Sequence, residues 1–168
     1  MKITVFNGSP RGKRSITNMI VNEFIEGAKK ASAEVENIFL VDKKIECCRG
    51  CFTCWVKTPG KCVINDDMEK LISKFVSSNI VVFATPLYVD NVSGIMKNFM
   101  DRLIPILDPH SEIDNCEHRH LLRIKKMPKF AVISNSGFPE QSHFQVLRLL
   151  FNRINRNLQT EIVAEIYR

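Results

Sequence analysis

Five of the six cysteines in this chain lie within the segment IECCRGCFTCWVKTPGKC, residues 45–62. Cys48, Cys51 and Cys54 are evenly spaced, with two residues between each, and Cys62 follows after seven more. Four thiolates at such spacing are able to ligate one [4Fe–4S] cluster. Zinc suits the pattern less well, because zinc ribbons use two separated pairs of cysteines. The segment therefore predicts an iron–sulfur cluster, free thiols that pack or exchange electrons, or, third, a zinc site.

The remaining sequence indicates a compartment in which these thiols stay reduced. The first residues, MKITVFNGSP, lack the long apolar core that follows a basic head in a secretory signal. No apolar run reaches the length of a transmembrane helix. We therefore expect a cytoplasmic protein without a membrane partner, for which a disulfide framework is disfavoured.

A second group of residues suited to chemistry follows the first apolar run. The segment KITVFN (2–7) stops at GSPRGKRSITN, and a helix is predicted to begin near Ser15. Amide groups at a helix N-terminus would bind a phosphate, and four side chains would add charge-assisted hydrogen bonds: Ser9, Arg11, Ser15 and Thr17. The segment is neither G-x-G-x-x-G nor G-x-x-x-x-G-K-[ST], which disfavours a dinucleotide pyrophosphate and a nucleotide triphosphatase. The alternative is an ordinary turn between a strand and a helix.

Two further loops share the Gly, Pro, Ser and Asn content of tight turns with exposed amides. TPLYVDNVSG (85–94) follows the third predicted strand, and SNSGFPE (134–140) follows the fourth. Tyr88 offers an aromatic ring beside a planar ligand, and Gly137 and Phe138 lie on the other loop. A monophosphate pocket flanked by two such loops suggests flavin mononucleotide (FMN).

The periodicity of apolar residues predicts the elements that position these loops. Strands are expected at 2–7, 34–40, 79–86, 129–137 and 161–167, and helices at 15–31, 65–76, 93–104 and 143–154. Regular alternation of strands and helices implies right-handed crossovers and a parallel sheet covered on both faces. The predicted fold is α/β, a doubly wound five-stranded parallel sheet of order 2-1-3-4-5. In such a sheet the three loops meet at the switch point between the first and third strands.

The chain as a whole fits one domain, residues 1–168, with a cysteine-rich loop at 45–64. Its net charge of +6 is dispersed along the sequence, which disfavours a nucleic-acid partner. The sequence stops directly after the fifth predicted strand, so the closing helix expected beside the first helix is absent. Either a partner subunit or further residues would then cover part of one sheet face.

These segments together resemble the flavodoxin-like NAD(P)H-dependent FMN reductase family. GSPRGKRSITN is similar to the family's phosphate loop, and residues 66–102 are similar to its central segment almost continuously. The resemblance implies FMN as cofactor, NAD(P)H as cosubstrate, and assembly as a homodimer or homotetramer. It assigns the phosphate to Ser9, Arg11, Ser15, Thr17 and Asn18. It places the isoalloxazine ring against Pro86, Leu87, Tyr88 and Val89, with Ser134, Asn135, Ser136 and Gly137 opposite.

The cysteine loop is similar to that of one branch, the iron–sulfur flavoproteins. This likeness implies Cys48, Cys51, Cys54 and Cys62 as ligands of a [4Fe–4S] cluster. Because the loop leaves the second strand at the rim that carries the phosphate loop, we expect the cluster to reach a flavin in this or a neighbouring subunit. Many reductases of the family carry a similar loop without a documented cluster, so the free-thiol alternative stays open.

The sequence thus predicts an FMN-dependent oxidoreductase that takes electrons from a nicotinamide nucleotide or a reduced carrier. Hydride transfer to a flavin needs no side-chain acid or base, so we assign no catalytic residue. The alternative is a non-catalytic electron carrier of the flavodoxin type that docks to redox partner proteins. A signalling domain of the response-regulator type would need an acidic cluster at the strand ends, where this chain is basic.

Overall fold

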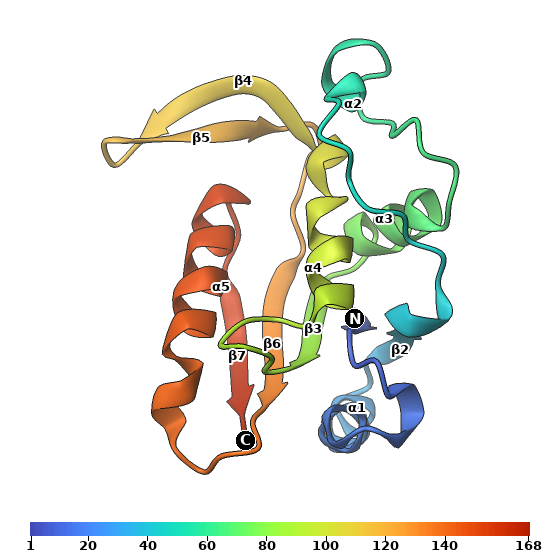
Figure 1. Ribbon diagram of the computed structural model, residues 1–168, viewed down its shortest axis with the longest axis vertical. Coiled ribbons are helices and arrows are strands. Elements are labelled where there is room, and N and C mark those ends of the chain that lie inside the picture. Colours follow the sequence, from blue (N-terminus) through green and yellow to red (C-terminus); the bar gives the residue numbers. More distant parts are fainter.

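A computed structural model describes residues 1–168 and contains a parallel five-stranded sheet with helices on both faces (Figure 1). The strands are β1 (Lys2–Asn7), β2 (Glu34–Phe39), β3 (Ile80–Pro86), β6 (Lys129–Asn135) and β7 (Ile162–Tyr167). Their order is β2-β1-β3-β6-β7, which confirms the predicted order because β6 and β7 are the fourth and fifth strands of this sheet. β3 is an almost continuous apolar run since both of its faces are buried.

Four helices cover the sheet, and a fifth lies on the cysteine loop. α1 (Ile16–Lys30) packs on one face, and α3 (Met68–Val76), α4 (Gly94–Asp101) and α5 (Gln145–Asn157) pack on the other. α2 (Thr53–Val56) is a single turn, and short 3₁₀ segments occur at Gly12–Arg14, Leu40–Asp42, Ile104–Ile106 and Gln141–Phe144. None of the helices combines the length and the apolar character that crossing a membrane requires.

The larger core lies under α3, α4 and α5 and is rich in phenylalanine. Phe6 stacks on Phe99 with ring centroids 4.5 Å apart, and Phe83 meets Phe130 edge-on at 5.1 Å. The smaller core lies under α1, which is the one helix that this chain contributes to that face. Ala164 of β7 packs at its margin and stays half-buried.

Residues 107–122, for which the sequence predicts neither a helix nor a strand, form a second sheet. β4 (Leu107–Asp114) and β5 (Glu117–Leu122) form an antiparallel hairpin between α4 and β6. Both strands are mainly polar and β4 contains Pro109, so the apolar alternation that identifies a strand is missing. Asn115 and Cys116, at φ 48° and 64°, close the hairpin with the left-handed conformations that a two-residue turn requires.

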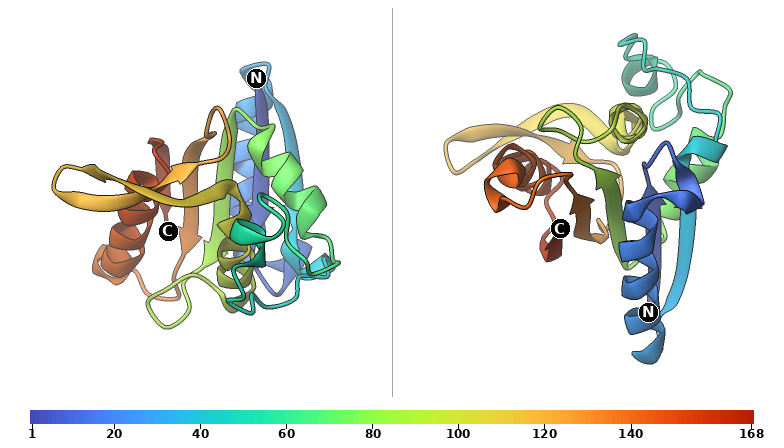
Figure 2. Two further views of the ribbon diagram at one scale, coloured as in Figure 1. Left: turned by 90° about the horizontal axis from the view of Figure 1, so that it is seen from above. Right: turned by 60° about the horizontal axis from the view of Figure 1, so that its bottom comes forward.

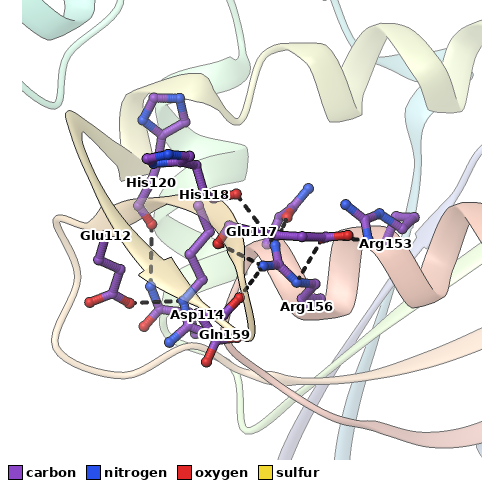
Figure 3. Close-up of polar contacts among 10 residues, drawn as sticks. Glu112, Asp114, Glu117, His118, His120, Arg153, Arg156 and Gln159 are labelled. Atoms are coloured by element: carbon purple, nitrogen blue, oxygen red, sulfur yellow. Dashed lines mark hydrogen bonds and ion pairs between the residues drawn. The ribbon is translucent and has the colours of Figure 1, made fainter.

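The hairpin extends over the end of α5, as Figures 1 and 2 show. Arg156 of α5 donates from Nη2 to the carbonyl oxygens of Asp114 at 2.7 Å and Glu117 at 2.9 Å (Figure 3). Gln159 donates to the carbonyl oxygen of His120 at 3.2 Å. These contacts fix a hairpin that has little apolar surface of its own to bury.

Candidate functional site

The loops that follow β1, β3 and β6 meet at the carboxyl rim of the sheet, at the lower end of Figure 1. The amide of Gly8 donates to the carbonyl oxygen of Ala84 at 2.8 Å, and that of Leu87 donates to the carbonyl oxygen of Asn135 at 2.9 Å. The Thr17 hydroxyl donates to the Asn135 side chain at 2.6 Å and so links α1 to β6. The three loops therefore form one continuous surface.

Gly8 lets the first loop approach the beginning of α4 closely. A Cβ atom on Gly8 would lie 2.7 Å from Cβ of Met96, which is closer than carbon atoms tolerate. The Ser93 hydroxyl donates to the carbonyl oxygen of Gly8 at 2.6 Å, and the Ser93 amide donates to Thr85 Oγ1 at 2.9 Å. The turn after β1 is therefore held against the turn after β3.

The entry to α1 has the electrostatics of an anion site. Ser15 caps the helix, because its hydroxyl accepts from the Asn18 amide at 3.0 Å. Arg11, Lys13 and Arg14 are exposed just before it, and neither the 3₁₀ segment nor the first turn of α1 carries an acidic residue. The free amides and the positive end of the helix favour an anion at this position.

The predicted phosphate-binding residues differ in whether their side chains are already hydrogen-bonded within the protein. Ser9 and Thr17 are buried at the loop, whereas Arg11 is exposed. The Ser15 hydroxyl also donates to the carbonyl oxygen of Gly12 at 2.7 Å. The Asn18 side chain is tied to Asn37 and to the backbone of the loop. The direct contacts to an anion that remain open are thus those of Arg11, Ser9 and the backbone amides.

The second loop presents Tyr88 and Val89 to solvent, with side chains 45% and 98% exposed. Tyr88 and Asn91 exchange backbone hydrogen bonds of 2.9 and 3.0 Å across a two-residue turn. Val89 in this turn has φ 49°, which is unfavourable for a β-branched residue. Strain of this kind is typical of ligand-contacting turns. Pro86 and Leu87 form the base of the loop.

The third loop carries an unpartnered polar group. The Ser134 side chain is fully buried at the end of β6, and its hydroxyl has no hydrogen-bond partner. Ser136 accepts from the amide of Phe138 at 3.1 Å, and the neighbouring Gly137 is exposed. Phe138 is exposed and stacks on His143 with ring centroids 5.0 Å apart. A cationic, amide-rich loop facing two loops with exposed rings fits a ligand that carries a phosphate and a planar ring.

The cysteine loop takes a path that the sequence did not indicate. It leaves β2 at the carboxyl rim, but it then follows α4 toward the other end of the sheet (Figure 1). Asn98 donates to the carbonyl oxygen of Ile45 at 2.7 Å, and the Trp55 ring donates to that of Ile104 at 3.1 Å. An eight-residue helix such as α4 is about 12 Å long. The loop therefore leaves β2 at the rim of the phosphate loop, as expected, but it brings Trp55 and Cys62 to the far end of α4.

All six cysteines are free thiols. Burial raises the pKa of the Cys54 thiol, and negative charge on Cys62, Cys51 and Cys48 raises it further, so each of these three thiols lies within electrostatic reach of Cys54. Hydrogen bonds from the side chain and the amide of Thr53 lower the pKa of the Cys51 thiol. No three His, Cys, Asp or Glu side chains are arranged to hold a metal ion. The four thiols fit a [4Fe–4S] cluster in number and chemistry. Their sulfur atoms do not converge on one point in this structure.

A buried ion pair, which the sequence analysis missed, closes the base of this loop. Arg102 and Asp66 have side chains 1% and 0% exposed, with 2.6 Å between Nη1 and Oδ2. Arg102 also contacts the loop itself, donating to the carbonyl oxygen of Glu46 and, at 3.6 Å, to Sγ of Cys62. The signal in the sequence was an arginine between the apolar residues Met100 and Leu103 at a helix end.

The carboxylate of Asp66 is held in its charged form. Burial alone would raise the pKa of Asp66, but hydrogen bonds from Arg102 and from the amides of Glu46 and Met68 outweigh it and hold the pKa below its ordinary value. The same pairing raises the pKa of Arg102 despite its burial. At the start of α3, Oδ1 of Asp66 accepts from the Met68 amide at 3.0 Å.

Comparison with known proteins agrees with this geometry. The family model described as NADPH-dependent FMN reductase matches residues 1–132. An iron–sulfur flavoprotein of Archaeoglobus fulgidus is 33% identical over 141 residues, which cover 84% of this chain and 58% of that protein. An iron–sulfur flavoprotein of Methanosarcina thermophila is 31% identical over 104 residues, which cover 62% and 53%. The chain thus spans little more than half the length of these relatives.

Solved structures share the fold at low sequence identity. An NAD(P)H:quinone oxidoreductase from Methanothermobacter marburgensis superposes with a TM-score of 0.73 at 15% identity, covering 99% of this chain and 85% of that chain. An FMN-dependent NADH-azoreductase from Bacillus anthracis, in complex with FMN, has a TM-score of 0.69 at 19% identity, covering 98% and 87%. Since the family match spans β1, the loop after it, the cysteine loop and β3, the chain belongs to the NADPH-dependent FMN reductase family.

Proposed function

We propose that this chain binds FMN at the carboxyl rim of its sheet and acts as a flavin-dependent NAD(P)H oxidoreductase. The observation that carries the proposal is the loop between Gly8 and Ser15. It is pressed against α4, lacks acidic residues and ends at a capped helix N-terminus. The family match covers this loop and the turn after β3, and it ends before Ser134. The roles of residues 134–137 therefore rest on the geometry of the rim.

When bound, FMN would supply the redox chemistry, accepting a hydride from a nicotinamide and passing electrons on singly. The residues of the chain would bind the cofactor and orient its ring. Arg11, Ser9 and the amides before α1 would hold the phosphate, as charge-assisted hydrogen bonds do at helix N-termini. Pro86, Leu87, Tyr88 and Val89 would lie on one side of the ring, with Ser134 to Gly137 opposite. Assembly as a homodimer or homotetramer would exclude water from the exposed rim.

We further propose that Cys48, Cys51, Cys54 and Cys62 ligate a [4Fe–4S] cluster that exchanges single electrons with a flavin. The number and spacing of the thiols support it, as do the curated relatives named iron–sulfur flavoproteins. Because the loop lies beyond the end of α4, a flavin on a neighbouring subunit is the more accessible partner. Free thiols and a zinc site remain the competing outcomes for this loop.

Steady-state oxidation of NADPH and NADH separates an enzyme from an electron carrier. The protein is purified anaerobically, loaded with FMN and mixed with each nucleotide and a soluble quinone. A reductase gives multiple turnovers that depend on FMN, and riboflavin at the same concentration supports less activity because it lacks the phosphate. A single flavin reduction without turnover would identify a carrier of the flavodoxin type. Iron and acid-labile sulfide assays on the same preparation test the cluster separately.

A further inference from the structure

Arg102 is a fully buried cation that FMN binding does not explain. It lies just beyond the last residue of α4 and is 2% exposed. Asp66 accepts from Nη1 at 2.6 Å and from Nη2 at 3.0 Å. Taking two charges out of water costs several kcal/mol per ion, which their attraction offsets only in good geometry. An apolar pair would fill the same space at less cost, so the ion pair calls for a role beyond stability.

The remaining contacts of Arg102 all lead to the cysteine loop. Nη1 donates to the carbonyl oxygen of Glu46 at 2.5 Å, at the beginning of the loop. The Glu46 amide in turn donates to Asp66 Oδ2 at 2.9 Å, at the end of the loop. Nη2 donates to Sγ of Cys62 at 3.6 Å. One guanidinium therefore joins both ends of the loop to a predicted ligand sulfur.

We infer that Arg102 positions Cys62 as a cluster ligand and raises the reduction potential of the cluster. This inference rests on the cluster part of the proposed function. A hydrogen bond to a ligand sulfur favours the more negative, reduced state, and hydrogen bonds and nearby charge are among the factors that set such potentials. Burial removes the screening that would weaken the effect at a surface. Asp66 offsets part of the charge but leaves the N–H···S hydrogen bond in place.

Lys61 provides a matched control for charge alone. It is adjacent to Cys62 in the sequence, but its side chain is 67% exposed and pairs with Glu69 at 3.2 Å. Removing that charge changes the surface near the cluster without touching a ligand sulfur. Screening by solvent and salt makes its expected influence small.

The test compares cluster potentials in anaerobically reconstituted protein titrated with dithionite. Arg102→Lys keeps a positive charge, but its single nitrogen has three N–H donors in place of the four hydrogen bonds that the two Nη atoms of Arg102 make to Asp66, Glu46 and Cys62. The double variant R102M/D66N removes both charges, so no unpaired buried ion remains to unfold the protein. Both should make the cluster harder to reduce by about tenfold in the equilibrium constant, or about 59 mV for one electron. Lys61→Gln should change the equilibrium constant for reduction of the cluster by less than threefold. None of the variants should change the equilibrium constant for reduction of FMN by more than threefold.

A second measurement leaves Arg102 and Asp66 unchanged and covers the case in which both Arg102 variants fail to fold. The protein is grown with arginine labelled with ¹⁵N in the guanidino group, and the reduced cluster is studied by pulsed electron paramagnetic resonance. The hydrogen bond predicts a weak ¹⁵N coupling to the electron spin. Arg49, the exposed arginine near Cys51, is changed to lysine in the labelled protein so that it cannot give the signal.

The outcomes separate this inference from the proposed function. Wild-type potentials in both Arg102 variants, or no ¹⁵N coupling, would overturn the inference and leave the cluster in place. Variants that keep FMN but lose iron would support the positioning of Cys62. If wild-type protein holds no iron and sulfide, the cluster proposal and this inference both fail, while FMN binding is still judged by its own titration.

Discussion

At the scale of single residues, the side chain that decides the phosphate assignment is Arg11. It precedes the 3₁₀ segment, is exposed and has no ion-pair partner. Ser15 and Asn18, by contrast, already use their side chains to cap the helix and hold the loop. Arg11 therefore supplies the positive charge that attracts the anion, whereas Ser15 and Asn18 hold the conformation of the loop.

Replacing Arg11 by alanine should weaken FMN binding by about 10- to 100-fold, because a hydrogen bond to a charged group contributes about 1.5–3 kcal/mol. Riboflavin affinity should not change, since riboflavin has no phosphate. Fluorescence titration of both ligands measures the two dissociation constants. Arg14→Ala, in the same segment, is the matched control. Equal losses for FMN and riboflavin would show that Arg11 supports the loop rather than binding the phosphate.

The Arg102–Asp66 pair makes a separate prediction about acid stability. Because the pKa of Asp66 is lowered on folding, its contribution is present above the unfolded pKa, about 4, and is lost as the pH falls through the folded value. Urea unfolding at pH 6 and pH 3 should thus show a larger loss in the wild type than in R102M/D66N. Arg102→Ala alone should cost about 3–5 kcal/mol at pH 7, since it strands a buried carboxylate. An equal pH dependence in wild type and double variant would refute the role given to Asp66.

At the scale of elements, the β4–β5 hairpin owes its position to α5 rather than to a core of its own. The Arg156 guanidinium, 18% exposed, donates to backbone carbonyls at the hairpin tip, while Arg153 forms a half-exposed pair with Glu117 (Figure 3). Partly buried charged donors to carbonyl oxygens contribute more than a solvent-screened ion pair does.

Arg156→Ala should therefore release the hairpin tip without unfolding the sheet. Amide hydrogen exchange at residues 114–120 should become at least tenfold faster, while exchange in β1 and β3 stays as it is. Arg153→Ala should change the same amides by less than threefold. Unaltered exchange at the tip in Arg156→Ala would mean that other contacts hold the hairpin.

What the sequence could predict follows from burial. Strands with both faces buried, such as β3, have continuous apolar sequences. The order of these apolar segments along the chain was enough to predict the strand order of the sheet and the meeting of three loops at its carboxyl rim. The hairpin left no such run because its strands lie on a helix end and face solvent. The Arg102–Asp66 pair joins residues 36 positions apart, and no local pattern reports such a contact. The path of the cysteine loop depends on the side chains of Asn98, Trp55 and Arg102, which donate to backbone carbonyl oxygens, and hydrogen bonds of this kind leave no periodic pattern in the sequence.

At the scale of the whole molecule, exposed apolar side chains surround the carboxyl rim. Ile16 is 60% exposed, Met19 65%, Phe138 64% and Val89 98%. Exposed apolar side chains that come together on one face mark interaction surfaces in folded proteins, so we propose a subunit contact at this rim. They lie on three different loops or helix starts that the sheet brings together, which is what a subunit contact around a flavin would require.

The chain should accordingly sediment with a mass of at least twice 19.3 kDa when FMN is bound. Met19→Glu, which places a charge on the exposed end of α1, should lower the association constant at least tenfold. Val56→Glu, at an exposed apolar residue of α2 on the cysteine loop, should not. A monomer at high concentration with FMN bound would contradict this use of the rim.

The most direct test of the account is a crystal structure of the chain grown with FMN. We predict the phosphate on Arg11, Ser9 and the amides before α1, with the ring between the Tyr88 turn and the loop that begins at Ser134. A complex in which FMN lies elsewhere, or crystals grown in excess FMN whose rim between β1 and β3 stays empty, would contradict it.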